Sequence, residues 1–306
     1  MRIRIFYILF FYVLSVSAQE FDNHWITYPT VDSTSQIWFR QTYISKKRPV
    51  NAKITVITTG YCDVYVNEFN VNTDFLVPYR NNETNNPISL TYDITRFLRS
   101  DSNTIAILYA PSHACIEQHQ ISITYYGKNW QGKNFAHFSD KNWLCHLADH
   151  SLSADGTESQ DGSFYPFNWK SNSFDPACWL PTVAVSNSKK PNSVNYSSFY
   201  PATKMDKIIV PKYFDLKGDS VCYEFGKGFY GTLRVTLRDC KKGEKIIVDD
   251  SEYTCNGMMD EQINQRFPKY HGNRIFIHGD GKFKREQIQR IEAILIIPYF
   301  HASFLY

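Results

Sequence analysis

Two stretches of sequence decide the fold: ITVITTGYCDVYVNEFNVN at residues 54–72 and ISLTYDITRFLRSDSNTIAILY at residues 88–109. The first alternates apolar and polar residues and breaks at Asn67 and Glu68, where Asn67 tolerates the positive φ of a tight hairpin turn. The second predicts two strands joined by a short helical turn over residues 95–99 and a polar corner. Together they predict closely spaced antiparallel strands.

Short strands of the same kind are predicted along the first half of the chain, at intervals typical of a β-sandwich. The chain is 16% aromatic, with 21 Tyr and 22 Phe against only 14 Gly and 13 Pro, and this composition also favours strands. The predicted strands span residues 36–45, 52–58, 63–67, 88–94, 104–109 and 120–126.

Three short motifs, VYVN at 64–67, YDIT at 92–95 and NTIAI at 103–107, together resemble the galactose-binding-like β-sandwich at the front of bacterial α-L-rhamnosidases. Residues 139–185 extend the resemblance, because the aromatic and acidic anchors of that module recur in the same order. A family element with a carboxylate and an arginine is replaced here by SQDGSFYPFNW at 159–169, so its ligand contacts are not carried over. The matching anchors are Asp140, Trp143, Trp169, Asp175 and Trp179.

The last third of the chain resembles the β-sandwich that comes next in the same family, chiefly through VCYEFGKGFYGTLRVTL at 221–237. The stretch REQIQRIEAILIIPYF at 285–300 fits either a helix face or a buried strand. In the family a catalytic (α/α) barrel follows these sandwiches, so the resemblance implies the accessory part without that barrel. It implies an all-β protein of two consecutive jelly-roll, galactose-binding-like β-sandwich domains, divided into a signal peptide at 1–18, a first sandwich at 19–186, a linker at 187–205 and a second sandwich at 206–306.

The N-terminus predicts a secretory signal peptide. Arg2 and Arg4 begin an apolar run over residues 5–16 that is too short for a membrane span, and the small residues 16–18 form a cleavage site. We therefore expect cleavage before Gln19 and a periplasmic or secreted protein. The rest of the sequence has no apolar run long enough to span a membrane, and a net charge of +3 with dispersed Lys and Arg predicts no nucleic-acid binding.

The seven cysteines include no C-x-x-C pair, which argues against a structural zinc site. In an oxidising compartment some could pair, and the odd number then leaves at least one unpaired. The alternative, favoured here because the family does not depend on disulfides, is that most are small buried apolar residues. The cysteines are Cys62, Cys115, Cys145, Cys178, Cys222, Cys240 and Cys255.

An irregular acidic and aromatic stretch between residues 155 and 179 is the candidate carbohydrate-binding site. A sugar stacks its apolar face on an exposed ring, while carboxylates and amides bond its hydroxyls. The same acidic residues could hold calcium, but their spacing does not match an EF-hand loop. No cofactor is therefore expected, with calcium as the alternative. For each ring the alternative is packing in the core. The candidate binding residues are Asp155, Glu158, Asp161, Tyr165 and Trp169.

No catalytic residue is predicted. Asp249, Asp250 and Glu252 are candidates for the carboxylate pair that glycoside hydrolysis needs, but acidic residues at a strand end are more often solvated turn residues. We therefore expect an exported, non-catalytic carbohydrate-binding protein related to α-L-rhamnosidase accessory domains, with a glycan or oligosaccharide as its partner. The alternative is a truncated or split α-L-rhamnosidase-type glycoside hydrolase, whose catalytic domain belongs to a separate chain.

Overall fold

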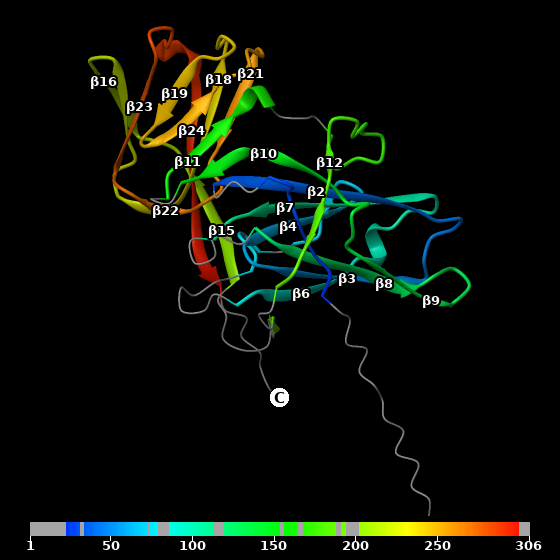
Figure 1. Ribbon diagram of the computed structural model, residues 1–306. Coiled ribbons are helices and arrows are strands. Elements are labelled where there is room, and N and C mark those ends of the chain that lie inside the picture. The colour runs from blue at the N-terminus through cyan, green and yellow to red at the C-terminus, as the bar shows by residue number, and fades with distance from the viewer. Residues whose placement is uncertain are drawn as a thin grey trace, which may run out of the picture.

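The structure is built from β-strands, and Figure 1 shows them gathered into two sandwiches, as predicted. Short 3-10 turns occur at η1 (Thr95–Phe97), η3 (Gly162–Phe164) and η4 (Arg285–Gln287). The computed structural model describes residues 23–30, 34–72, 74–78, 86–112, 119–153, 156–164, 168–187, 191–193 and 202–299.

The first sandwich packs a seven-stranded sheet against one half of a twelve-stranded sheet. The seven-stranded sheet has the order β13 (Val183–Val185), β1 (Trp25–Thr27), β8 (Ile121–Lys128), β3 (Asn51–Thr58), β6 (Ile88–Asp93) and β14 (Asn192–Ser193), with β9 (Asn134–Phe138) paired to β8.

The twelve-stranded sheet runs through both sandwiches. In the first sandwich it contains β11 (Glu158–Asp161), β10 (Leu144–Leu152), β2 (Ser35–Ile44), β7 (Ser102–Ala110), β4 (Tyr61–Val66) and β5 (Phe69–Asn70), with β12 (Leu180–Pro181) paired to β10. In the second it contains β16 (Tyr213–Lys217), β17 (Ser220–Glu224), β23 (Arg274–Gly279), β19 (Lys245–Val248) and β20 (Ser251–Thr254).

A five-stranded sheet completes the second sandwich. Its order is β15 (Ala202–Ile209), β24 (Ile288–Tyr299), β18 (Phe229–Arg238) and β21 (Asp260–Asn264), with β22 (Lys269–His271) paired to β18. The stretch whose periodicity fits a helix or a strand is therefore a strand, which pairs with β15 on one side and β18 on the other.

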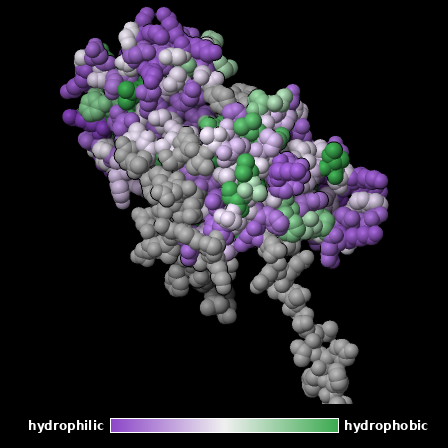
Figure 2. Space-filling model, viewed as in Figure 1, coloured by the Kyte–Doolittle hydropathy of each residue, from purple (hydrophilic) through white to green (hydrophobic). Residues whose placement is uncertain are grey.

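Each sandwich has its own apolar core. One core contains Ile54, Val56 and Ile107 and lies between the seven-stranded and twelve-stranded sheets, while the other contains Val235 and Ile277 and lies between the twelve-stranded and five-stranded sheets. On the face shown in Figure 2, the second sandwich is largely hydrophilic and the hydrophobic side chains of the first are scattered. Most apolar residues of the strands thus lie on the sheet faces that pack against each other inside each sandwich.

The hairpin at Asn67 has the predicted turn, since Asn67 and Glu68 have φ values of 50° and 76°. The amide of Asn67 is also buried, where it donates to Phe97 O (2.8 Å) and Asn103 Oδ1 (2.9 Å). Asn103 Oδ1 accepts a further bond from Arg99 N at 2.7 Å. Two buried amides therefore tie the hairpin to the corner after η1, which explains why these motifs occur together.

Strand β10 was not predicted, because its sequence LCHLADHSL mixes apolar and charged residues. It nevertheless pairs with β2 in the middle of the twelve-stranded sheet. Asp149 and His150 are buried there, where His150 bonds to Asn264 O of the second sandwich and Asp149 pairs with His150. A buried polar pair of this kind hides the alternation that marks most strands.

The two sandwiches are joined through β11, which pairs antiparallel with β10 and parallel with β20. In Figure 1 β10 and β11 run between the two halves of the molecule. The segment predicted as a linker, 187–205, contains β14, which pairs with β6 of the first sandwich. It also contains the start of β15, which pairs with β24 of the second, so each end of this segment is bound into a sheet.

Candidate functional site

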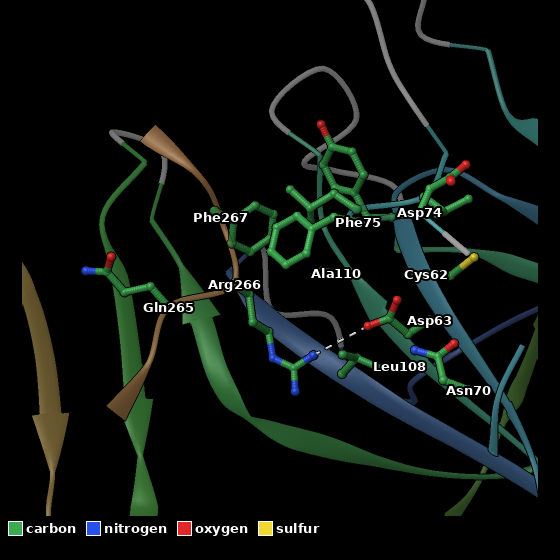
Figure 3. Close-up of a pocket in the computed structure, with 13 residues that line it drawn as sticks. Cys62, Asp63, Asn70, Asp74, Phe75, Leu108, Ala110, Gln265, Arg266 and Phe267 are labelled. Atoms are coloured by element: carbon green, nitrogen blue, oxygen red, sulfur yellow. Dashed lines mark ion pairs between the residues drawn. The ribbon is translucent and has the colours of Figure 1, made fainter. Parts of the chain in front are cut away.

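A pocket of about 240 Å³ lies where the two sandwiches meet, and we call it the junction pocket (Figure 3). The first sandwich contributes β4, β7, the end of β5 and the segment after it, and the second contributes the residues that follow β21. The lining residues are Tyr61, Cys62, Asp63, Asn70, Asp74, Phe75, Leu76, Val77, Leu108, Ala110, Gln265, Arg266 and Phe267.

Aromatic rings and a charged pair lie in different parts of this pocket. The rings of Tyr61 and Phe267 meet edge to face, with centroids 5.9 Å apart. Arg266 Nη1 lies 3.8 Å from Asp63 Oδ2, and these side chains are 30% and 29% exposed. Figure 3 shows the rings of Phe75 and Phe267 on one side and the Asp63–Arg266 pair on the other. The pocket thus combines apolar faces with accessible polar groups.

The charged groups beside the pocket are only partly hydrated. Burial raises the pKa of the Asp63 carboxyl, although the positive charges of Arg266 and Lys170 oppose this shift. Burial and the charge of Arg266 lower the pKa of Lys170, whose ammonium lies 4.1 Å from the centre of the Tyr65 ring. A hydroxyl that bonds to Asp63 or Arg266 would replace little water, which strengthens such a bond.

Glu158 fixes the backbone that carries Arg266 and Phe267 into the pocket. Its Oε2 accepts hydrogen bonds from Arg266 N at 2.7 Å and Phe267 N at 3.3 Å. The side chain is only 5% exposed, and this burial raises the pKa of the Glu158 carboxyl despite the opposing charge of His150. Glu158 is therefore a positioning residue for the pocket and does not line it.

Further polar contacts from β10 and β11 hold Asn264, two residues before Arg266. Asn264 O lies 3.0 Å from His150 Nε2, and Asn264 N donates to Gln160 Oε1 at 3.1 Å. His150 Nδ1 lies 2.9 Å from Asp149 Oδ1. Burial raises the pKa of Asp149, but the hydrogen bond and the charge of His150 outweigh it, so the net shift is downward. One side of the pocket therefore depends on contacts between the sandwiches.

Among the residues predicted to bind carbohydrate, the described ones, Glu158, Asp161 and Trp169, do not form one exposed surface. Asp155 and Tyr165 lie outside the described residues. Glu158 is buried, whereas Asp161 is exposed and its Oδ1 accepts hydrogen bonds from Ser163 N and Oγ. Three residues apart on one strand, these two carboxylates face opposite sides of the sheet, which does not favour a shared calcium ion.

Trp169 is 3% exposed and packs on the outer face of the twelve-stranded sheet. It stacks on Trp38, with centroids 5.2 Å apart, and on Trp179 at 6.1 Å. The ring belongs to a small core, which is the alternative considered for it, and it offers no exposed face for stacking. A sugar-binding role for the stretch from Asp155 to Trp179 stays a prediction, and it would rest on residues other than this ring.

The acidic residues near β20 are each engaged in local contacts. Asp249 Oδ1 accepts from Phe276 N at 3.1 Å, and Lys269 pairs with Asp250. Lys245 Nζ lies 2.7 Å from Glu252 Oε1. These contacts fit the structural role that was preferred for this cluster over glycoside hydrolysis.

The junction pocket was not predicted, because its residues come from parts of the sequence about 200 positions apart. One signal was present. Asp63 interrupts the apolar pattern of the strand YCDVYV. A carboxylate within such a strand is an informative exception to the rule that buried residues are apolar. Nothing local marked Arg266 or Phe267 as its partners.

The comparisons with known proteins bear on the fold. No protein-family model matches the chain, and no curated protein matches it. Among solved structures, the α-L-rhamnosidase from Dictyoglumus thermophilum matches 90% of this chain with a TM-score of 0.75 and 18% identity. The Aspergillus terreus α-L-rhamnosidase matches 90% with a TM-score of 0.72 and 17% identity, and the Streptomyces avermitilis enzyme, solved with L-rhamnose, matches 87% with 0.74 and 16%.

The chain has the fold of part of an α-L-rhamnosidase. The match covers 36% of the first two structures and 29% of the third, so this chain spans about a third of their length. The predicted resemblance to the β-sandwiches of α-L-rhamnosidases is thereby confirmed for the fold. Within the part of the chain that the structure describes, no helix has the length and apolar character needed to cross a membrane.

Proposed function

We propose that this protein binds a carbohydrate in the junction pocket, as an exported accessory-type module without glycosidic activity of its own. The observation that carries the proposal is the Asp63–Arg266 pair, less than a third exposed beside aromatic rings in one pocket. Sugars are bound by this combination, in which a ring covers an apolar face and charged or amide groups bond the hydroxyls.

The size of the pocket favours a short ligand. Its volume of about 240 Å³ is somewhat below the roughly 300 Å³ at which sites for drug-sized molecules begin. One sugar residue, or the end of an oligosaccharide, suits this space. The exposed amide of Asn70 and the carboxylate of Asp74 at the lining provide further partners for hydroxyls at the rim.

The structural neighbours support a sugar ligand by analogy. One of them was solved with L-rhamnose, so we choose L-rhamnose and rhamnose-containing oligosaccharides as the first ligands to test. The non-catalytic part of the proposal rests on the resemblance to accessory sandwiches and on the local pairing of Asp249, Asp250 and Glu252.

The test is calorimetric titration of the purified protein with a panel of sugars that includes L-rhamnose. A shallow site of this kind should bind with a Kd on the order of 0.1–1 mM, about 4–5.5 kcal/mol. Phe267→Ala should weaken binding about fivefold, because the loss of one ring costs about 1 kcal/mol. Asp63→Asn should weaken it as well, because the carboxylate is the stronger acceptor.

Two variants serve as matched controls. Trp130→Ala removes an exposed ring that does not line the pocket, and it should leave binding unchanged. Asp161→Asn tests the acidic stretch predicted from the sequence. The proposal fails if no sugar binds, or if folded Phe267→Ala and Asp63→Asn bind as well as the wild type. Loss of binding only in Asp161→Asn would move the site to that stretch.

A further inference from the structure

Cys240 and Cys255 lie together inside the second sandwich, just beyond the ends of strands from its two different sheets. Cys240 follows the end of β18 in the five-stranded sheet, and Cys255 directly follows β20 in the twelve-stranded sheet. Their sulfur atoms and a carboxylate oxygen of Glu261 all lie within 4.8 Å of one another. Cys255 is fully buried and Cys240 is 5% exposed. The two thiols therefore meet in the interior between the layers.

The carboxylate of Glu261 is occupied by other donors. Its Oε2 accepts from Tyr253 Oη at 2.8 Å and from Asn256 N at 2.7 Å, and its Oε1 accepts from Gly257 N at 2.9 Å. These bonds fix the loop after Cys255 and leave little capacity for a metal ion, which would need at least three available protein ligands here. The two sulfur atoms are close to each other, and Cys240 Sγ has in addition only a weak contact with Arg238 O at 4.0 Å among the described residues.

We propose that Cys240 and Cys255 form a disulfide bond that joins the two sheets of the second sandwich. In the reaction the thiolate of one cysteine attacks a disulfide oxidant, and the second cysteine then displaces the reduced oxidant. An S–S bond forms, two protons leave the cysteines, and two electrons reduce the oxidant to a dithiol or to two thiols. Bond formation requires the two sulfurs to move from this contact to the S–S distance of about 2.05 Å.

Burial determines when this bond forms. A hydrogen bond between the two thiols, together with burial, raises the pKa of Cys255, so the reactive thiolate is scarce once the sandwich has closed. Oxidation therefore takes place during folding, while both cysteines are accessible, and in the compartment that the predicted signal peptide specifies. The bond closes a loop of about 15 residues, a length for which cross-linking restricts the unfolded chain appreciably.

The test uses the whole chain, secreted with its own N-terminal segment. The protein is denatured in iodoacetamide without reductant and digested, and the peptides are analysed by mass spectrometry. We expect a linked peptide pair that contains Cys240 and Cys255, which becomes two alkylated peptides after reduction. Alkylation of both cysteines without reductant overturns the proposal, as does a bond from either cysteine to a different one.

Thermal unfolding provides a second readout. Reduction should lower the Tm of the wild type by roughly 5–10 °C and should not change that of the Cys240→Ser/Cys255→Ser variant. Cys222→Ser is the matched control, because Cys222 is also buried in the second sandwich but lies outside the cluster, and it should keep the shift. One equivalent of zinc in the purified wild type, absent from the double variant, would overturn the disulfide in favour of a metal site.

Discussion

At the scale of single residues, Glu158 illustrates how a buried charge can organise a site that it does not touch. Its carboxylate accepts the backbone N–H groups of Arg266 and Phe267, and both of those side chains line the junction pocket. The energetic cost is the desolvation of the carboxylate, which raises the pKa of Glu158. Two backbone hydrogen bonds offset part of this cost, because charge-assisted bonds are among the stronger ones.

This cost makes the effect of Glu158→Gln dependent on pH. With its pKa raised in the folded state, the wild type binds more protons there than when unfolded. The stability that the Glu158 carboxyl contributes to the folded state is therefore fully present below the ordinary pKa of 4.5. It is lost as pH rises through the raised pKa. Glutamine keeps an acceptor oxygen but carries no charge. In urea unfolding, the wild type should lose stability relative to Glu158→Gln as pH rises from 4 to 8.

Asp280→Asn is the control with the opposite sign. The hydrogen bond from the backbone of Lys282 lowers the pKa of Asp280, so this carboxylate stabilises the folded state above its ordinary pKa and loses that effect as pH falls. The wild type should thus gain stability relative to Asp280→Asn as pH rises. A pH-independent difference for Glu158→Gln, or a slope like that of Asp280→Asn, would contradict the interpretation.

At the scale of elements, β11 joins strands of the two sandwiches into one continuous twelve-stranded sheet. Only four residues long, it pairs with β10 on one side and with β20 on the other. Gln160, within this strand, also bonds to Asn264, next to the backbone of the pocket. Because the ladder is continuous, the opening of one sandwich exposes backbone groups of the other. The two cores should therefore unfold as one cooperative unit.

Ser159→Pro tests this coupling. Proline lacks the backbone N–H and fixes φ, so it should break the ladder at the point where Ser159 lies opposite Glu252. We expect one calorimetric transition for the wild type and two for Ser159→Pro, the lower by several degrees. Ser159→Ala loses the same hydroxyl but keeps the N–H, and it should retain one transition. Two transitions in the wild type would show that the sandwiches unfold independently.

At the scale of the whole molecule, the junction places the candidate site where both sandwiches are needed to build it. Asp63 comes from the first sandwich and Arg266 from the second, and they meet only when β10, β11 and β20 are paired. Binding in the pocket should consequently stabilise the two sandwiches together. The same dependence means that the first sandwich alone would lack the side formed by Gln265, Arg266 and Phe267, and that the second alone would present only that side.

Export remains a prediction about the whole chain, since residues 1–18 lie outside the described residues. We expect the protein in the periplasmic or secreted fraction, with Gln19 as its first residue by mass spectrometry. Leu9→Arg places a charge in the apolar run and should leave an uncleaved protein inside the cell, whereas Leu9→Ile should be processed normally. Wild-type protein that starts at Met1 and stays in the cytoplasm would rule out the signal peptide.

Sequence patterns were enough to predict the all-β class, the turn at Asn67 and the likeness to α-L-rhamnosidase sandwiches. These features depend on local rules, because the period of two and the turn residues are set by neighbours in the chain. β24 stayed ambiguous because its alternation is interrupted: exposed residues 289 and 290 and buried residues 291–293 follow one another, and its register shifts against both β15 and β18.

Which residues cover each face of a strand could be seen only once the chain was folded. Trp169 is an aromatic residue in an irregular stretch, and its burial depends on Trp38 and Trp179. Glu158 is buried because residues 266 and 267, over a hundred positions away, supply two N–H groups. Local spacing shows which side chains share a face, but the environment of that face is set by contacts distant in sequence. The junction pocket and the pair of Cys240 and Cys255 belong to this second kind of information.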